Sequence, residues 1–278
     1  GLVWYPVLLT SPECGQRSNK PIKSVADYKN VKMRQCGRIQ AKILQDLGGA
    51  AIFMPGAEIY MALQRGTIDA GEFSVPECDW SMGFQEVTKY WILPGWHQPG
   101  PIGGMMINKK SHDGLSDRGK FVLRESALAA MMWGWTYFEY SSAEYTNKFL
   151  AAGTKPSKLD QAALDRIQEL SFKYMLDDAK ANPDYARICF SMLKYMKDFE
   201  GWRDMQSPFM FGRNLPGIDP VLAEVESLVK KSGDYDKVIK LEREVRKRME
   251  KQEFWKPGTP FITNPVWQSK DVPFVKMK

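Results

Sequence analysis

Between residues 31 and 73, short apolar runs alternate with helical stretches, and this alternation is the strongest constraint on the fold. Continuous apolar runs of about five residues predict buried strands, whereas apolar residues at three- and four-residue spacing predict amphipathic helices. Glycines at Gly48 and Gly66 end the two helical stretches. The predicted elements are a strand at Val31–Cys36, a helix at Ile39–Leu47, a strand at Ala50–Met54, a helix at Glu58–Arg65 and a strand at Ile68–Phe73.

Strands that alternate with helices predict βαβ units, in which the strands run parallel and helices cover the sheet. We therefore expect an α/β fold with a largely parallel sheet. Ligands of such sheets bind beyond the carboxyl ends of the strands. Arg34 and Glu72 both come late in predicted strands. The pattern therefore predicts that they lie at the edge of the sheet where a site would form.

The rest of the chain begins with strands and becomes helical after residue 116. We expect a buried strand at Leu2–Leu9, a short helix at Val25–Lys29, and strands at Val87–Leu93 and Gly104–Asn108. The predicted helices are a long one at Phe121–Leu150, followed by Leu159–Ala181, Asp184–Phe199, Pro220–Lys231 and Tyr235–Glu253. An aromatic, proline-rich tail runs from Phe254 to Lys278. We divide the chain into residues 1–115, 116–203 and 204–278.

Composition excludes several classes of protein. The 278 residues carry a net charge of +6, and the charges are interspersed apart from one basic tract at Lys240–Lys251. This distribution argues against a nucleic-acid partner. The basic net charge suits a small anionic ligand or anionic lipid headgroups. No apolar run is long enough to span a bilayer. The four cysteines show no metal-binding spacing, and the sequence leaves open whether Cys14 and Cys36 are free thiols or a disulfide.

Arg34 is the strongest candidate for a binding residue. A buried guanidinium needs an anionic partner, and its planar fork matches a carboxylate. That partner is either a small acidic ligand or an internal carboxylate, Glu72 or Glu13, and the sequence leaves both open. If Glu13 and Glu72 come together, they need a cation or a shared proton. The alternative is that they are two solvated loop acids.

The sequence contains no pattern typical of an enzyme. His97 follows Trp96 in a loop rich in Gly and Pro, and neither a nucleophile motif nor a metal-ligand spacing accompanies it. A structural role in the loop is therefore favoured over a catalytic one, and we predict no catalytic residue. The aromatic segment Met131–Phe138 is interpreted as a core helix or, alternatively, as a protein-contact surface.

Several segments together resemble the signature of the DctP family, the periplasmic solute receptors of TRAP transporters. The later run Leu93–Gly100, which reads LPGWHQPG, is similar to the subgroup that binds 2-oxo acids and related monocarboxylates. The resemblance extends from about residue 3 to Trp202. Its segments are Val31-Lys32-Met33-Arg34, Leu47-Gly48-Gly49-Ala50, Pro55, the run Glu58–Ala70, which reads EIYMALQRGTIDA, and Glu72.

The resemblance implies a type II periplasmic binding protein-like α/β fold with a long connecting helix and, in this chain, an incomplete first lobe. It implies that Arg34 pairs with the solute's carboxylate and that a cation, Na⁺ or Ca²⁺, joins the site. The implied metal ligands are Glu13, where the subgroup has Gln, and Glu72. Phe73 is an implied ligand-binding residue where the subgroup usually has Trp. The extra charge of Glu13 favours a divalent ion such as Ca²⁺.

Two functions follow from these features. The first is a periplasmic receptor that binds a small carboxylate without catalysis and works with TRAP membrane subunits. The second is a repurposed accessory subunit of a larger periplasmic or membrane-associated complex, of respiratory or photosynthetic type. In that case, the extension at 204–278 and the Met- and Trp-rich helix would contact other protein subunits, because an incomplete lobe leaves apolar surface uncovered.

Overall fold

A computed structural model describes residues 1–206 and, beyond them, the isolated positions 223, 230, 231, 233, 235, 236, 239, 240 and 243. The chain forms two compact units, Gly1–Lys197 and Asp198–Lys278. The helices predicted at Pro220–Lys231 and Tyr235–Glu253 and the tail from Phe254 lie, apart from those isolated positions, outside the described residues. The divisions at residues 115 and 203 stay predictions.

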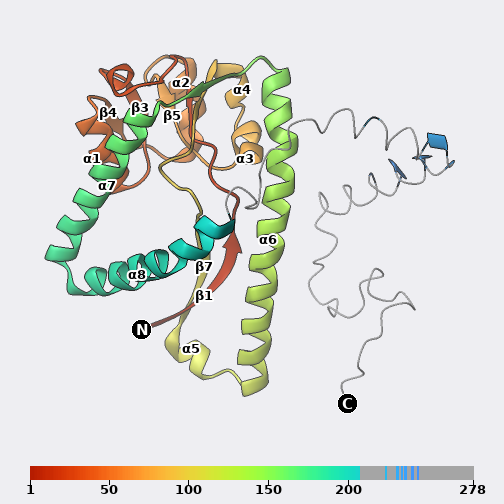
Figure 1. The fold of residues 1–278 in the computed structure, drawn as a ribbon. Coiled ribbons are helices and arrows are strands. Elements are labelled where there is room, and N and C mark those ends of the chain that lie inside the picture. Colours follow the sequence, from red (N-terminus) through yellow and green to blue (C-terminus); the bar gives the residue numbers. More distant parts are fainter. Residues whose placement is uncertain are drawn as a thin grey trace. The chain divides into compact units, whose positions relative to one another are not determined.

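The elements confirm the predicted α/β class (Figure 1). The strands are β1 (Leu2–Leu9), β2 (Gln16–Ser18), β3 (Lys32–Arg34), β4 (Ala50–Ile52), β5 (Ala70–Gly71), β6 (Tyr90–Leu93), β7 (Ile102–Asn108) and β8 (Lys155–Lys158). The helices are a 3₁₀ helix (Val25–Tyr28), α1 (Arg38–Asp46), α2 (Gly56–Gln64), α3 (Pro76–Ser81), α4 (Phe84–Val87), α5 (Lys109–Asp113), α6 (Asp117–Ala151), α7 (Gln161–Ala181) and α8 (Pro183–Gln206). The long helix predicted from residue 121 is α6.

Six strands form a mixed sheet in the order β4-β3-β5-β2-β6-β8. β3 runs parallel to β4 and β5, and β6 runs parallel to β8. β2 lies between these two groups and is antiparallel to both β5 and β6. The expectation of a largely parallel sheet was therefore wrong at the centre of the sheet. β2 was not predicted because its three residues, Gln16–Ser18, are polar and carry no strand periodicity.

β1 was correctly placed but wrongly described as buried. Among the described strands, it pairs only with β7, in a separate antiparallel ribbon, and Leu2 and Trp4 on its outer face are 63% and 51% exposed. The ribbon lies alongside α6 (Figure 1). α6 buries small residues at intervals of seven, including Gly134. A Cβ on Gly134 would lie 2.8 Å from the Leu8 side chain, so glycine permits this close approach.

Helices cover both faces of the six-stranded sheet. Neighbouring residues of β6 point to opposite faces, as in any pleated strand. Ile92 belongs to a core cluster that includes residues of α1 and α7, whereas Trp91 belongs to a second cluster with Phe84 and with Phe149 of α6. Apolar packing on both faces holds the strands rigidly, so the loops at their ends are well positioned.

Candidate functional site

Four side chains meet at one edge of the six-stranded sheet. Arg34 is the last residue of β3, and Glu72 directly follows the adjacent parallel strand β5. Both therefore lie at the carboxyl ends of strands, as predicted. Glu13 precedes β2 and His97 follows β6, two strands that pair antiparallel with Gln16 opposite Ile92. The reversed direction of β2 thus brings Glu13 to the edge where His97 lies.

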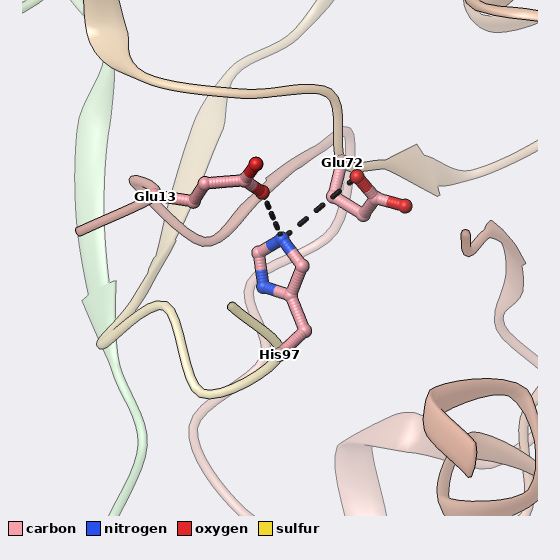
Figure 2. A group of neighbouring side chains, drawn as sticks. All are labelled: Glu13, Glu72 and His97. Carbon is pink, nitrogen blue, oxygen red and sulfur yellow. Dashed lines mark hydrogen bonds and ion pairs between the residues drawn. The ribbon is translucent and has the colours of Figure 1, made fainter. Parts of the chain in front are cut away.

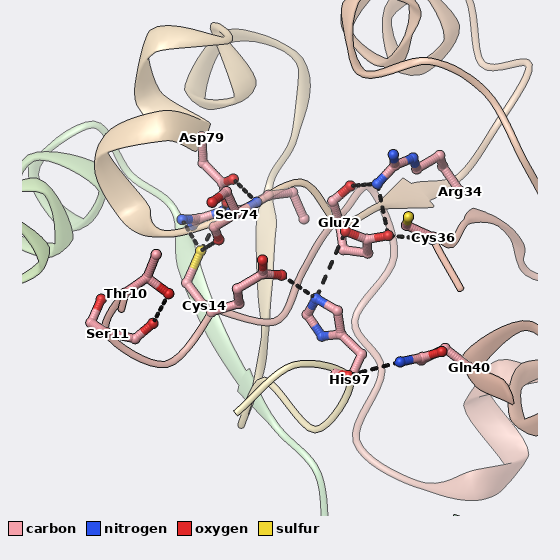
Figure 3. Close-up of polar contacts among 12 residues, drawn as sticks. Thr10, Ser11, Cys14, Arg34, Cys36, Gln40, Glu72, Ser74, Asp79 and His97 are labelled. Atoms are coloured by element: carbon pink, nitrogen blue, oxygen red, sulfur yellow. Dashed lines mark hydrogen bonds and ion pairs between the residues drawn. The ribbon is translucent and has the colours of Figure 1, made fainter. Parts of the chain in front are cut away.

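Arg34 and Glu72 form a buried ion pair. The Nη1 of Arg34 donates hydrogen bonds to Glu72 Oε1 at 2.7 Å and to the Glu72 backbone carbonyl at 2.8 Å. The Arg34 Nε donates to the Met54 carbonyl at 3.3 Å, and the Cys36 N–H donates to Glu72 Oε1 (Figure 3). The Nη2 of Arg34 makes no hydrogen bond within the part of the chain that the structure describes. Arg34 therefore keeps donors available for a ligand.

His97 lies between the two carboxylates. Its Nε2 is 2.9 Å from Glu13 Oε2 and 3.8 Å from Glu72 Oε2 (Figure 2). One ligand atom from each of these three buried residues lies within 4.8 Å of the others, a spacing that suits a metal ion. Among the described residues, Glu72 Oε2 has no hydrogen-bond partner, although Glu72 is only 1% exposed. A buried acceptor left unpaired is costly, so this atom is ready to bind a cation.

Burial dominates the electrostatics of Glu72. Loss of solvent raises the pKa of this carboxyl above its usual value, and the nearby Glu13 raises it further. The Arg34 guanidinium, the Cys36 N–H and His97 act in the opposite direction and do not cancel the effect of burial. A cation beside Glu72 would favour the charged carboxylate and lower this pKa.

Backbone hydrogen bonds hold the three loops of the site together. The Glu13 N–H donates to the Gln98 carbonyl at 3.1 Å, one residue from His97. The next residue, Cys14, donates its N–H to the Ser74 carbonyl at 3.3 Å, two residues from Glu72. The loop after β6 also lies close to the backbone of Glu13 at Gly95, where a Cβ would lie 2.0 Å from the Glu13 carbonyl oxygen. The relative positions of the site residues are therefore fixed by the backbone.

A second buried ion pair, which the sequence did not indicate, adjoins this site. Arg17 Nε lies 2.8 Å from Asp79 Oδ2, and both side chains are fully buried. The guanidinium packs over the rings of both Trp91 and Phe149, at 3.9 and 3.7 Å from their centroids. Asp79 also accepts a hydrogen bond from the Cys14 thiol at 2.9 Å. Burial raises the pKa of Asp79 despite the Arg17 charge.

The cysteines are free thiols in the structure. Cys14 donates its thiol hydrogen towards Asp79 and the Ser74 carbonyl, and Cys36 lies on the other side of Glu72 (Figure 3). Burial and the neighbouring Asp79 raise the pKa of the Cys14 thiol. A raised thiol pKa keeps Cys14 protonated and unreactive near neutral pH.

The structure brings together three of the four predicted ligand-binding residues. Arg34 contacts Glu72, and Glu13 joins them through His97. The ring of Phe73 packs edge-on against Phe84, with centroids 6.4 Å apart, and is half-buried. His97 was not predicted to join the carboxylates. The sequence feature that could have indicated this role was the position of His97 in the loop directly after β6.

Comparison with known proteins decides the family. Residues 15–178, more than half of the chain, match the model of DctP, the bacterial extracellular solute-binding proteins of family 7. This chain belongs to the DctP family. Proteins of this family bind solutes and are not enzymes. Among the residues that the structure describes, none of the helices has the length and apolar character needed to cross a membrane.

Two curated relatives are binding proteins of the periplasm. The chain is 27% identical, over 198 residues, to a monocarboxylate 2-oxoacid-binding periplasmic protein of Nostoc; the match covers 71% of this chain and 54% of the relative. It is 36% identical, over 114 residues, to the 2,3-diketo-L-gulonate-binding periplasmic protein YiaO of Escherichia coli, covering 41% of this chain and 34% of that protein. The chain thus spans about half or less of the length of these relatives.

Solved structures of TRAP periplasmic solute-binding proteins share the fold. The protein of Pseudoalteromonas atlantica, with bound sodium and pyruvate, is 26% identical with a TM-score of 0.64. The protein of Colwellia psychrerythraea, with bound calcium and pyruvate, is 27% identical with a TM-score of 0.65. Each match covers 74% of this chain and 62% of the other. These comparisons favour the receptor interpretation over that of an accessory subunit.

Proposed function

We propose that this chain is the carboxylate-binding part of a TRAP-type periplasmic receptor for a small monocarboxylate of the 2-oxo acid class. Arg34 pairs with the carboxylate of the ligand, and Glu13 and Glu72 hold a cation that bridges to it. The observation that carries the proposal is a buried arginine with an unused Nη2, beside a buried Glu72 whose Oε2 is unpaired. Binding occurs without catalysis.

The charges at the site support a cation. Arg34 contributes one positive charge, whereas ionised Glu13 and Glu72 contribute two negative charges. A monocarboxylate would add a further negative charge in a buried position, which is unfavourable without compensation. Na⁺ would leave one negative charge in excess, whereas a divalent ion would balance the site. The relatives with bound pyruvate, one holding sodium and one holding calcium, support the same arrangement.

Phe73 is proposed to supply an apolar wall for the end of the ligand opposite its carboxylate. Its ring is half-buried and directly follows Glu72 in the chain, so part of it remains available for contact. Aromatic side chains bury large apolar areas, which favours small acids with a hydrocarbon end. Because its relatives are periplasmic, we assign this chain to the periplasm, where it would deliver its ligand to TRAP membrane components.

Calorimetric titration with pyruvate tests the proposal. The protein is first stripped with a chelator and then titrated in buffers that contain Ca²⁺, Na⁺ or neither. We expect binding only when a cation is present. Arg34→Met should weaken binding by at least about 100-fold, because it removes the charge-assisted hydrogen bond of Nη2 and leaves the ligand's carboxylate without its positive partner. The exposed Arg65→Met is the matched control and should bind like the parent.

The absence of both binding heat and a rise in melting temperature would overturn the proposal. That result must hold across pyruvate, lactate and 2-oxobutyrate, with either cation. Binding that survives Arg34→Met unchanged would contradict the assigned role of Arg34.

A further inference from the structure

We propose that His97 is a third protein ligand of the cation, and that the site therefore selects a transition-metal dication such as Zn²⁺ over Na⁺ and Ca²⁺. This inference rests on the proposed function, which places a cation between Glu13 and Glu72. It goes further by assigning His97 and by naming the chemical class of the ion.

The positions of the three side chains fit a shared ion. His97 Nε2 is 2.9 Å from Glu13 Oε2 and 3.8 Å from Glu72 Oε2. Around a zinc ion with bonds of about 2.1 Å, tetrahedral ligand atoms lie about 3.4 Å apart. The two separations from His97 therefore differ from this value by roughly half an ångström. The ligand atoms of all three residues lie within 4.8 Å of one another, so the two carboxylates would move closer together on binding. Figure 2 shows that the imidazole nitrogen and both carboxylates point towards one another.

An unsatisfied acceptor distinguishes this group from an acidic cluster on a surface. All three residues are buried, at 7% exposure for Glu13, 1% for Glu72 and 5% for His97. Glu72 Oε2 has no hydrogen-bond partner among the described residues and faces His97 Nε2. Buried polar atoms are satisfied in most proteins, so an unpaired carboxylate oxygen beside two other potential ligand atoms points to a cation as its partner.

The donor set determines the class of ion. Na⁺ and Ca²⁺ prefer sites built from oxygen atoms and take six or more ligands. Imidazole nitrogen suits zinc and its neighbours in the periodic table, which accept four ligands. Glu13, Glu72 and His97 supply three of these, and the carboxylate of the bound acid supplies the fourth. Arg34 Nη2 then binds the second oxygen of that carboxylate.

The experiment titrates ZnCl₂, CaCl₂ and NaCl separately into the full chelator-stripped chain, with no organic acid present. We expect one Zn²⁺ per chain, bound at least about 100-fold more tightly than Ca²⁺. His97→Gln replaces the nitrogen ligand with an amide oxygen of similar reach. It should weaken Zn²⁺ binding at least tenfold and change Ca²⁺ binding less than threefold.

The chain has only two histidines, so the control is clear. His112 lies on α5 and contacts the hydroxyl of Tyr5 on β1, so His112→Gln should leave Zn²⁺ binding unchanged. Substituted Co²⁺ should give a visible spectrum typical of four-coordinate nitrogen and oxygen ligands, without a thiolate charge-transfer band.

Ca²⁺ or Na⁺ bound as tightly as Zn²⁺ would overturn the inference, and so would Zn²⁺ binding that His97→Gln leaves unchanged. If pyruvate still binds with Ca²⁺ in either case, the proposed function survives and only the role of His97 fails. If neither a metal nor pyruvate binds, both fail. Circular dichroism of His97→Gln establishes whether the variant is folded. The comparison of Zn²⁺ with Ca²⁺ and Na⁺ is made on the parent protein and therefore does not depend on the variant.

Discussion

Two buried arginine–carboxylate ion pairs in the described part of the chain have nearly the same length but different surroundings. Arg17 and Asp79 are joined at 2.8 Å and are fully buried, and Arg34 and Glu72 are joined at 2.7 Å with 8% and 1% of their side chains exposed. The Arg17 guanidinium packs against the rings of Trp91 and Phe149, and Asp79 uses both carboxylate oxygens. The Nη1 of Arg17 has no hydrogen-bond partner among the described residues, but the side chain is fully buried and is therefore inaccessible to a ligand.

The pair of Arg34 and Glu72, by contrast, retains hydrogen-bonding atoms that no described residue uses. Glu72 Oε2 and Arg34 Nη2 have no hydrogen-bond partner within the described residues, and Glu13 adds a second negative charge. Burial and pairing alone therefore do not mark a binding site in this fold. A binding site is marked instead by an unpaired acceptor and an unpaired donor beside an excess of negative charge. The hydrogen-bonding and charge requirements of such a group are met only when a cation and an acid are bound.

The largest effect is expected when the buried pair of Arg17 and Asp79 is broken. Asp79→Leu should lower the free energy of unfolding by about 3–5 kcal/mol, because Arg17 is left buried without a countercharge. Urea denaturation followed by circular dichroism measures it. The double variant Arg17→Met/Asp79→Leu should recover most of the loss. A loss below about 1 kcal/mol for the single variant would mean that the pair is not structural.

Removal of Arg34 should destabilise the protein less. Arg34→Met should lower the free energy of unfolding by about 1–2 kcal/mol, because Glu72 has a raised pKa and can take up a proton when its partner is lost. The same denaturation measurement near neutral pH compares it with Asp79→Leu. If both variants lose equal stability, the contrast between the two pairs is wrong.

The pKa of Glu72 predicts a smaller, pH-dependent effect. Because burial raises this pKa in the folded state, the folded protein binds more protons than the unfolded chain above about pH 4.3. The stability of the cation-free protein should therefore fall as the pH rises through the raised pKa of Glu72. Melting temperatures of parent and Glu72→Gln, measured from pH 4 to 8, should show a weaker decline in the variant. The raised pKa of Asp79 lowers stability with rising pH in both the parent and the variant. An identical decline in the two proteins would therefore exclude Glu72 as the source of the decline.

The smallest expected effect concerns Phe73. Phe73→Leu should weaken pyruvate binding by no more than about tenfold, because only part of an apolar contact is lost. Its effect on unfolding should stay near 1 kcal/mol, since leucine still fills most of the space beside Phe84. Calorimetry and urea denaturation measure the two quantities. A loss of binding as large as that of Arg34→Met would make Phe73 a main determinant of affinity.

The sequence by itself determined the α/β class, the long helix and the positions of Arg34 and Glu72 at strand ends. These features follow from local periodicity and from the geometry of neighbouring parallel strands, which a short stretch of sequence already contains. The tertiary structure decided how β2 enters the sheet and where β1 pairs. The three polar residues of β2 carry no local signal, because their strand exists only through hydrogen bonds to β5 and β6. The meeting of Glu13, His97 and Glu72 depends on that long-range pairing, and it was therefore visible only in the folded protein.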